Sequence, residues 1–462
     1  MSTVVVIGAG VGGLATAARL AASGHAVTVF EQAETVGGKL GRFERDGFRF
    51  DTGPSLFTLP QIASELVELD LVRLDPIVRH RFADGTVLDS CSDQYTFLNR
   101  IAMAFGDAAA DDWQRLWQRA ARVWRASWRH VLTAPVDHPL QLAPLAWRLR
   151  DLAAIAPGRT LRGVGRRHLR DPRLRMLLDR YATYAGADPR HAPAALLAIP
   201  YAEMHYGGWY LRGGLGTLAD ALLSRCKSLG VRVSVGSAVA SVVVAGSAVS
   251  GVRLADGRFA AADVVVAAVD ALQVYRDLLP VPRRAARLRR RGLSGFVQLL
   301  GVRGRTPGLA HHTVFFPPSS SYDAEFDAVF GGRPAPDPAI FVSVPDDPLV
   351  HPPGDEAWFV LVNAPASVPS SYGDQMLDVL AARGLDVRSR MLFRAERTPA
   401  DLEVLTGSPG GAIYGSVPGL LRPPNRGPVR GLFLVGGSVH PGGGLPLVML
   451  SAKLVADRIG AA

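Results

Sequence analysis

A glycine-rich segment and one acidic residue near the N-terminus have the types and spacing of a nucleotide-binding turn. The segment Gly8-Ala9-Gly10-Val11-Gly12-Gly13 follows a short β-branched run at 4–7, and Glu31 comes directly after a second apolar run at 26–30. Between them, 14–23 reads as an Ala-rich helix that stops at Gly24. The order strand, turn, helix, strand and acid predicts a βαβ unit that binds a dinucleotide.

Each of these residues has its own task in such a unit. Gly8 permits the tight turn, Gly10 lets the backbone approach a pyrophosphate, and Gly13 lets the helix pack closely on the strand. The phosphates lie at the positive end of the helix dipole. The Glu31 carboxylate accepts hydrogen bonds from an adenosine ribose. A glycine-rich turn without a ligand is the alternative, but both strands and the acid in register favour nucleotide binding.

A second glycine-rich loop lies at the other end of the chain. An apolar run at 431–435 leads into the loop 436–446, and 447–459 reads as a helix. Backbone N–H groups of such a loop and the positive end of the following helix can bind a further part of the same cofactor. A separate glycine pair at 37–38 precedes Lys39, whose ammonium group adds positive charge near phosphate groups.

These segments together resemble the FAD-dependent amine oxidase and phytoene desaturase superfamily. The resemblance rests on Gly37-Gly38-Lys39, on the segment 47–55 with Phe50-Asp51-Thr52-Gly53-Pro54, and on the pattern His440-Pro441-Gly442-x-Gly444-x-Pro446, which is typical of bacterial carotenoid desaturases. The chain departs from the family pattern at Gly437, where many members carry an acid, and at Ala268-Val269-Asp270, where Asn-Ala-Asp is usual.

The resemblance implies FAD as the cofactor and a set of residues that hold it. These residues are Gly8, Gly10, Val11, Gly12, Gly13, Glu31, Gln32, Gly37, Gly38, Lys39, Gly53, Pro54, Val239, Gly436, Gly437, Gly444 and Leu445.

The catalytic residues are less clearly marked. FAD accepts a hydride at N5 while a proton leaves the adjacent carbon, so a proton acceptor is expected. Candidates are His440 in the C-terminal loop, and Glu203 and Tyr184 in the middle of the chain. Each of the three also has a structural interpretation as a locally hydrogen-bonded side chain. No metal-ligand cluster or nucleophilic triad stands out, and two cysteines, Cys91 and Cys226, are too few for a disulfide framework.

The predicted fold class is α/β, with a discontinuous Rossmann-like FAD-binding domain. A chain of 462 residues is long enough for two or three compact units. The FAD-binding domain is expected at 1–85, 205–280 and 405–462. An inserted antiparallel-sheet substrate domain at 281–404 provides the floor of a substrate cavity, and 86–204 is a helical cap.

The cap contains an amphipathic helix at 111–131 with aromatic residues on one face. At about 100° per residue, one face carries Trp113, Trp117, Trp124 and Trp128, and arginines occupy the opposite face. Two interpretations stand. In the first, the indoles belong to the hydrophobic core and the arginines form a solvated face. In the second, the helix lies on a bilayer with Trp at the interface and Arg near lipid phosphates. A net charge of +10 suits contact with anionic lipid or nucleic acid, but no nucleic-acid-binding motif occurs.

No signal peptide or membrane-spanning segment is expected from the sequence, and the few cysteines favour a reducing cytoplasmic setting, with association to a membrane surface as the further possibility. The resemblance implies desaturation of C–C bonds in a long apolar isoprenoid or carotenoid. Alternatives are a flavin amine oxidase, a polyene isomerase or saturase, and a non-catalytic prenyl-lipid carrier. The oligomeric state is not indicated.

Overall fold

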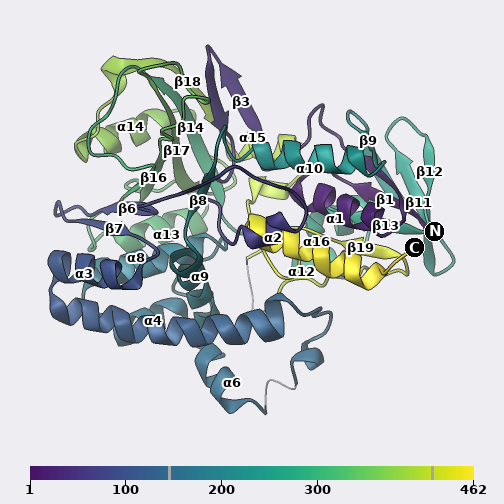
Figure 1. Cartoon of the computed structure of the whole chain (residues 1–462), viewed down its shortest axis with the longest axis horizontal. Coiled ribbons are helices and arrows are strands. Elements are labelled where there is room, and N and C mark those ends of the chain that lie inside the picture. Colours follow the sequence, from purple (N-terminus) through teal and green to yellow (C-terminus); the bar gives the residue numbers. More distant parts are fainter. Residues whose placement is uncertain (144–146, 418–420) are drawn as a thin grey trace.

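The computed structural model describes residues 1–143, 147–417 and 421–462. Figure 1 shows three parts: a lobe that contains both termini, a second lobe built on a larger sheet, and a row of helices beneath them. The chain passes between the two lobes more than once, so neither is a continuous stretch of sequence.

The first lobe is built on a five-stranded parallel sheet of order β19-β13-β1-β2-β9. Its strands come from the three separate segments that the sequence assigns to the FAD-binding domain. They are β1 (Thr3–Ile7), β2 (Ala26–Phe30), β9 (Arg232–Ser234), β13 (Val264–Ala267) and β19 (Leu432–Leu434). The central strand β1 is buried from Val4 to Ile7, as expected for a parallel strand covered on both faces. The α/β class predicted from the sequence is confirmed.

Three helices pack together on this sheet, and a small sheet packs against β13. The helices are α1 (Val11–Ala22), α10 (Thr217–Ser228) and α16 (Leu445–Ile459); the small antiparallel sheet comprises β10 (Val239–Ala245), β11 (Ala248–Leu254) and β12 (Phe259–Ala261). In Figure 1, α1 from the N-terminal end lies beside α16 from the C-terminal end. This contact joins the two glycine-rich turns that precede these helices.

The second lobe is built on a seven-stranded sheet of order β18-β14-β17-β16-β15-β6-β7. Its strands are β6 (Val78–Arg81), β7 (Val87–Ser90), β14 (Ser294–Val302), β15 (His312–Phe315), β16 (Ile340–Ser343), β17 (Glu356–Ala364) and β18 (Met391–Arg397). The hairpin β6–β7 crosses the boundary expected at residue 85 and extends this sheet. The pair β15–β6 is parallel, whereas every other pair is antiparallel. The helices of this lobe are α13 (Tyr322–Phe330), α14 (Tyr372–Ala382) and α15 (Pro399–Thr406).

The helical cap follows the hairpin. It contains α3 (Gln94–Phe105), α4 (Asp107–Ser127), a π-helical turn (Trp128–Leu132), a 3₁₀ turn (Pro139–Leu142), α6 (Leu149–Ile155), α7 (Leu161–His168), α8 (Pro172–Thr183), a 3₁₀ turn (Ala194–Leu197) and α9 (Ala198–Tyr206). Asp171 begins α8 by accepting a hydrogen bond from the N–H of Arg173, and Pro172 occupies the first helical position.

The tryptophans of α4 face the protein interior. Trp113 packs edge-on against Phe97 of α3, the Trp117 ring lies 4.8 Å from that of Tyr201, and the Trp124 indole donates a hydrogen bond to the Tyr206 hydroxyl. The structure therefore bears out the core interpretation of this face, because these indoles are occupied by contacts with α3 and α9. No helix within the three described ranges is long and apolar enough to cross a bilayer.

The remaining elements are short connections. They are α2 (Gln61–Ser64), α11 (Ala271–Gln273), the π turn Val274–Leu278, α12 (Pro282–Arg287), the 3₁₀ turns Arg388–Arg390 and Pro409–Gly411, the hairpin β3 (Arg42–Arg45) and β4 (Phe48–Asp51), and the pair β5 (Leu71–Arg73) and β8 (Trp209–Leu211). The Asp51 carboxylate at the end of β4 accepts hydrogen bonds from the N–H groups of Leu215 and Gly216, so it links the N-terminal segment to the start of α10.

Candidate active site

A cavity of about 320 Å³ lies between the parallel sheet and the second lobe. The three segments of the first lobe meet in it, because the parallel strands β1, β13 and β19 end at the same edge of their sheet. All but one of the predicted cofactor residues line it. They are Gly8, Gly10, Val11, Gly12, Glu31, Gln32, Gly37, Gly38, Lys39, Gly53, Pro54, Val239, Gly436, Gly437, Gly444 and Leu445.

The exception is Gly13, which serves the packing of α1. A Cβ atom at this position would lie 1.9 Å from the carbonyl oxygen of Gly8, so only glycine allows the helix this close to the turn. The packing task predicted for Gly13 agrees with this position. Gly13 does not line the cavity, and its assignment as a cofactor-binding residue stays a prediction. Gly8 itself has φ +97°, a conformation that favours glycine in the tight turn.

The glycine turns leave room for a bound molecule. A Cβ built on Gly10 would have the carbonyl oxygen of Gly37, at 3.9 Å, among its nearest neighbours, and one on Gly436 or Gly444 would meet nothing within 4 Å. Each of these glycines thus exposes its backbone to the cavity where a side chain would fill the space. A cavity that both glycine-rich loops line with exposed backbone, and that also has the Glu31 carboxylate in its wall, has the groups that hold an FAD molecule.

That carboxylate belongs to Glu31, which is 7% exposed. One carboxylate oxygen accepts a hydrogen bond from the N–H of Ala9 at 2.6 Å, and the other accepts from the N–H of Ala33 at 2.9 Å. These bonds fix the carboxylate between the glycine turn and the end of β2. Carboxylate oxygens have further lone pairs, so Glu31 retains the capacity to accept from ribose hydroxyl groups.

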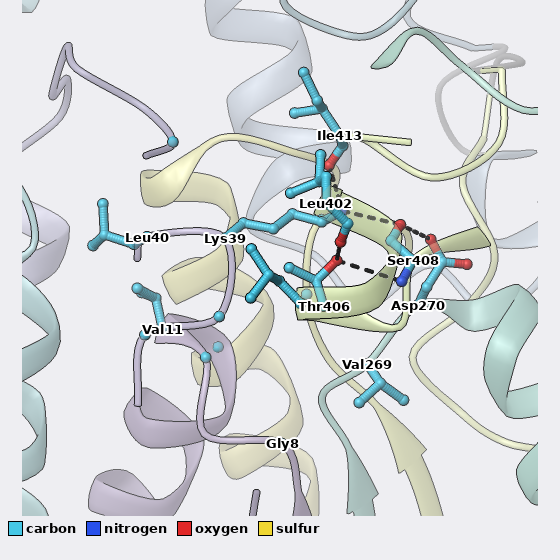
Figure 2. A pocket seen from close by; sticks show the side chains of 18 of the residues that line it. Gly8, Val11, Lys39, Leu40, Val269, Asp270, Leu402, Thr406, Ser408 and Ile413 are labelled. Atoms are coloured by element: carbon cyan, nitrogen blue, oxygen red, sulfur yellow. Dashed lines mark hydrogen bonds between the residues drawn. The ribbon is translucent and has the colours of Figure 1, made fainter. Parts of the chain in front are cut away.

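Lys39 has protein partners in addition to the task that the sequence suggested. Its ammonium group donates to the carbonyl oxygens of Ala412 and Ile413, at 2.7 and 2.8 Å, and to the Ser408 hydroxyl at 3.2 Å. Figure 2 shows the side chain extended from the N-terminal segment toward the loop that carries Ser408 and Ile413. Burial lowers the pKa of Lys39 to about 8. With three hydrogen bonds to neutral acceptors, Lys39 joins two segments of the cavity wall, and its contribution of charge toward the cofactor stays a prediction.

Asp270 anchors the same loop from the opposite side. Its carboxylate pairs with Arg291 at 2.7 Å, accepts from the Ser408 hydroxyl, and caps α11 through the N–H of Leu272. The carboxylate is almost completely buried. Asp270 stands where the family has the acid of Asn-Ala-Asp, so the departure at 268–270 preserves this anchor. The sequence carried no signal for the lining residues from α15, Leu402, Leu405 and Thr406, because they lie next to the turn only in the folded chain.

A second cavity, of about 570 Å³, lies between the large sheet and the helical cap. Its walls are mostly apolar and come from α9, β16, β17, the 53–59 segment and the C-terminal loop. Phe341 on β16 and Phe359 and Leu361 on β17 form part of its sheet side, which agrees with the predicted floor. The two cavities meet at residues that line both: Gly53, Pro54, Phe359, Leu361, Ile413, Tyr414, Gly443, Gly444 and Leu445.

Two of the three predicted catalytic residues lie together in the wall of the second cavity. Glu203 on α9 accepts a hydrogen bond from the Tyr181 hydroxyl at 2.7 Å, and the Tyr184 hydroxyl accepts one from Arg180 at 2.7 Å. The Tyr181 and Tyr184 rings pack at 5.2 Å, so the four side chains form one cluster. Burial raises the pKa of Glu203 to about 6, and burial also raises the pKa of Tyr184. Glu203 is therefore ionised at neutral pH, and Tyr184 is protonated.

His440, the third candidate, lines another wall of this cavity and has a structural partner. Its Nε2 lies 2.9 Å from the carbonyl oxygen of Ala134, and its own carbonyl oxygen accepts from the Asn425 side-chain amide. Burial lowers the pKa of His440, so the imidazole is neutral. These contacts attach the segment after the π-helical turn to the C-terminal loop.

The part of the chain that the structure describes contains no group of three His, Cys, Asp or Glu residues that could hold a metal ion. The cavity that the two glycine-rich loops line presents backbone groups, the Glu31 carboxylate and apolar side chains. This class of site, on a parallel-sheet domain with an inserted sheet, is that of the flavin-dependent oxidoreductases.

Comparison with known proteins agrees with this class. The model of the family described as "Flavin containing amine oxidoreductase" matches residues 11–300. The chain belongs to this family and is an FAD-dependent oxidoreductase, as the sequence resemblance implied. It is 32% identical to a 4,4′-diapolycopene oxygenase of Methylomonas sp, over 99% of this chain and 97% of that protein. It is 30% identical to a 1-hydroxycarotenoid 3,4-desaturase of Flavobacterium sp. (strain P99-3), over 99% of each chain.

Solved structures show the same fold at lower sequence identity. An oxidoreductase from Methanosarcina mazei superposes with a TM-score of 0.67 at 17% identity, over 98% of this chain and all of that one. This likeness supports the fold assignment alone.

Proposed function

We propose that the protein introduces double bonds into a long apolar polyene of the carotenoid type, with FAD as the oxidant. The observation that carries this proposal is the large, mostly apolar cavity that opens onto the cofactor cavity at shared residues such as Phe359, Leu361 and Tyr414. Such walls bind and desolvate a hydrocarbon chain. The names of the relatives, carotenoid oxygenase and carotenoid desaturase, support the same substrate class.

The chain's own residues would position the substrate and accept a proton. FAD, when bound, supplies an oxidant that accepts a hydride. Gly10, Glu31 and Gly436 would hold the cofactor, while Phe359 and Leu361 orient the polyene where the two cavities meet and exclude water from it.

Among the three candidates, Glu203 has the properties of a proton acceptor. It is 2% exposed yet ionised at neutral pH, with one carboxylate oxygen bonded to Tyr181; no hydrogen bond from the described residues reaches the other oxygen. The neutral His440 imidazole is hydrogen-bonded to the carbonyl oxygen of Ala134, and the Tyr184 hydroxyl accepts a hydrogen bond from Arg180. We therefore assign proton acceptance to Oε2 of Glu203, with Tyr184 and His440 as positioning residues.

The substrate would enter from a membrane surface. Leu142, Leu152 and Ile155 line the large cavity, and the same part of the cap exposes Leu140, Trp147 and Leu149, which are 74%, 88% and 73% exposed. Arg148 and Arg150 are exposed beside them. Exposed apolar side chains next to basic ones suit the interface of an anionic bilayer. In liposome flotation, the double variant Trp147→Ala/Leu149→Ala should lose binding to anionic vesicles, whereas Tyr95→Ala, an exposed aromatic residue of α3, should not.

Anaerobic reduction tests the proposed reaction. Holoprotein is mixed anaerobically with acyclic polyenes in liposomes, or with primary amines, and flavin absorption at about 450 nm is followed. The products are then separated by chromatography. Bleaching by a polyene, with a product that has one more double bond, supports the proposal. Bleaching by amines alone would assign the protein as an amine oxidase. Isomerised products without net bleaching would assign it as an isomerase. Saturated products that form only after the flavin has been reduced with dithionite, and that reoxidise it, would assign it as a saturase. Purified protein without flavin would support the carrier.

A further inference from the structure

A hydroxyl group in the wall of the cofactor cavity links a cation to a buried ion pair. The Lys39 ammonium group lies 3.2 Å from the Ser408 hydroxyl, which itself lies 3.2 Å from Oδ2 of Asp270. Figure 2 shows Ser408 between these two side chains. The same Asp270 oxygen accepts a hydrogen bond from Nη2 of Arg291 at 2.7 Å. Because Lys39, Ser408 and Asp270 all line the cavity, these charges lie at the cofactor site.

A third cation, Arg422, approaches the same place from the large cavity. Its guanidinium group donates to three backbone carbonyl oxygens, which are neutral acceptors. Arg291 and Arg422 both lie close enough for their charges to act on Lys39. Among the described residues, Asp270 is the one carboxylate whose charge acts on Lys39. Three cations and one carboxylate give these four side chains, the cation cluster, a net charge of +2 at neutral pH.

The cation cluster lies where the two cavities meet. The Ile413 carbonyl oxygen accepts a hydrogen bond from Lys39 at 2.8 Å, and Ile413 lines both cavities. Tyr414 beside it also lines both cavities, and Arg422 lines the large one. The part of FAD that reacts must face the substrate. The redox-active ring is therefore the part of the cofactor that we expect beside the cluster.

An excess of positive charge in a site removed from water is unfavourable unless negative charge is bound beside it. A flavin ring that has taken up two electrons and one proton carries one more negative charge than the oxidised ring. Nearby positive charge stabilises the anionic state of a group over its neutral state. The cluster therefore has the charge that the reduced cofactor needs.

We infer that the cluster of Lys39, Arg291, Arg422 and Asp270 stabilises the negative charge that the bound FAD gains on reduction, and so makes it a stronger oxidant. The cofactor phosphates have the same charge in both redox states, so a cation that acted on them alone would change the affinity for FAD and leave its potential unchanged. The inference concerns the bound cofactor and goes beyond the proposed function, because it holds for any substrate that reduces the flavin.

The protonation of Lys39 provides a second signature. Burial lowers the pKa of Lys39 to about 8, Asp270 opposes this shift, and the charges of Arg291 and Arg422 add to it. Burial raises the pKa of Tyr414, so this neighbour stays neutral. Negative charge on the ring would raise the pKa of Lys39. Above about pH 8, reduction of the flavin should therefore return a proton to Lys39 in addition to the proton that the ring takes up.

Reduction of the holoprotein in equilibrium with a redox dye tests the inference. Flavin and dye are reduced together, slowly and without oxygen, and absorption gives the ratio of reduced to oxidised flavin at each dye potential. Lys39→Gln removes the charge but can still donate hydrogen bonds, Lys39→Arg keeps the charge, and Asp270→Asn removes the negative charge of the cluster. Lys227→Gln, which changes an exposed lysine of α10, is the matched control. Dissociation constants of the apoproteins for oxidised and reduced FAD are measured in parallel.

The expected shifts differ in sign. At about pH 6, below the pKa of Lys39, Lys39→Gln should lower the ratio of reduced to oxidised flavin by at least about tenfold, or about 30 mV for two electrons. Asp270→Asn should raise the ratio, because the cluster loses its negative charge. Lys39→Arg and Lys227→Gln should stay within about threefold of the wild type. At about pH 9, the slope of potential against pH should show about two protons per reduced flavin in the wild type and about one in Lys39→Gln.

An unchanged ratio in Lys39→Gln, shifts of the same sign in Lys39→Gln and Asp270→Asn, or equal proton uptake by wild type and Lys39→Gln at the higher pH would overturn the inference. Equal losses of affinity for oxidised and reduced FAD in Lys39→Gln would also overturn it, because Lys39 would then act on the phosphates or on folding alone. This comparison applies even where the variant retains little flavin. No polyene is present in these measurements, so failure of the polyene reaction would refute the proposed function and leave this inference standing.

Discussion

The substitution Gly10→Ala separates cofactor binding from folding. Gly10 precedes α1 with φ −69° and ψ 174°, which alanine adopts without strain. The added methyl group would come no closer than 3.9 Å to Gly37 and Gly38, so the unfolding free energy of the apoprotein should change by less than about 1 kcal/mol. The same methyl group projects into the cavity where the backbone approaches the cofactor phosphates.

The expected loss of flavin affinity follows from the hydrogen bonds at stake. Displacing one backbone N–H from an anionic acceptor costs roughly 1.5–3 kcal/mol, which corresponds to about 10- to 150-fold weaker binding. Titration of apoprotein with FAD, followed by flavin fluorescence, measures this change, and thermal unfolding of the apoprotein measures folding. Gly13→Ala provides the contrast: its Cβ would lie 1.9 Å from the Gly8 carbonyl oxygen, so this variant should lose stability as well as flavin. Full flavin affinity in Gly10→Ala would refute the placement of the cofactor against this turn.

Two further predictions concern buried charges. Burial raises the pKa of Glu203 to about 6 in the folded chain, so the folded chain keeps the proton that the unfolded chain releases near about pH 4.5. As the pH rises from about 4.5 to above 6, the unfolding free energy of the wild type should therefore fall by about 2 kcal/mol relative to that of Glu203→Gln. Chemical denaturation at several pH values measures this difference. Arg291→Met leaves the buried Asp270 carboxylate unpaired and should lower the unfolding free energy by roughly 3 kcal/mol, whereas Arg212→Met, which breaks an exposed pair with Asp70, should change it by less than about 1 kcal/mol.

Clear outcomes would contradict these predictions. Parallel pH profiles for wild type and Glu203→Gln would show that the carboxyl group keeps its ordinary pKa in the folded chain. Equal decreases in unfolding free energy for Arg291→Met and Arg212→Met would show that the Arg291–Asp270 pair contributes no more to stability than a surface pair.

Much of the cofactor site follows from local sequence. The turn at 8–13 needs a glycine at positive φ and a glycine where the helix touches the strand, and both requirements concern neighbouring residues. The apolar runs of β1 and β13 are almost wholly buried and those of β2 and β19 mostly buried, so their composition marks them as strands of a parallel sheet. The choice of FAD came from the family resemblance, because local geometry indicates only a dinucleotide.

The hairpin β6–β7 illustrates a limit of local signals. Its residues alternate between buried and partly exposed positions as in any antiparallel hairpin. Nothing in this alternation states which sheet the hairpin joins, and its parallel pairing with β15 depends on a contact between segments more than 200 residues apart. The tryptophan face of α4 had the same ambiguity, because helical periodicity does not distinguish a protein core from a bilayer.

The sequence by itself determined the nucleotide-binding turn and the segments that build the parallel sheet, because each depends on backbone conformation or periodicity within a short stretch. Only the tertiary structure decided that Lys39 bonds to carbonyl groups at 412 and 413, and that Glu203 meets the Tyr181 hydroxyl in the wall of the second cavity. The physical reason is that a polar side chain takes its task from the partners around it, and these partners come from distant parts of the chain.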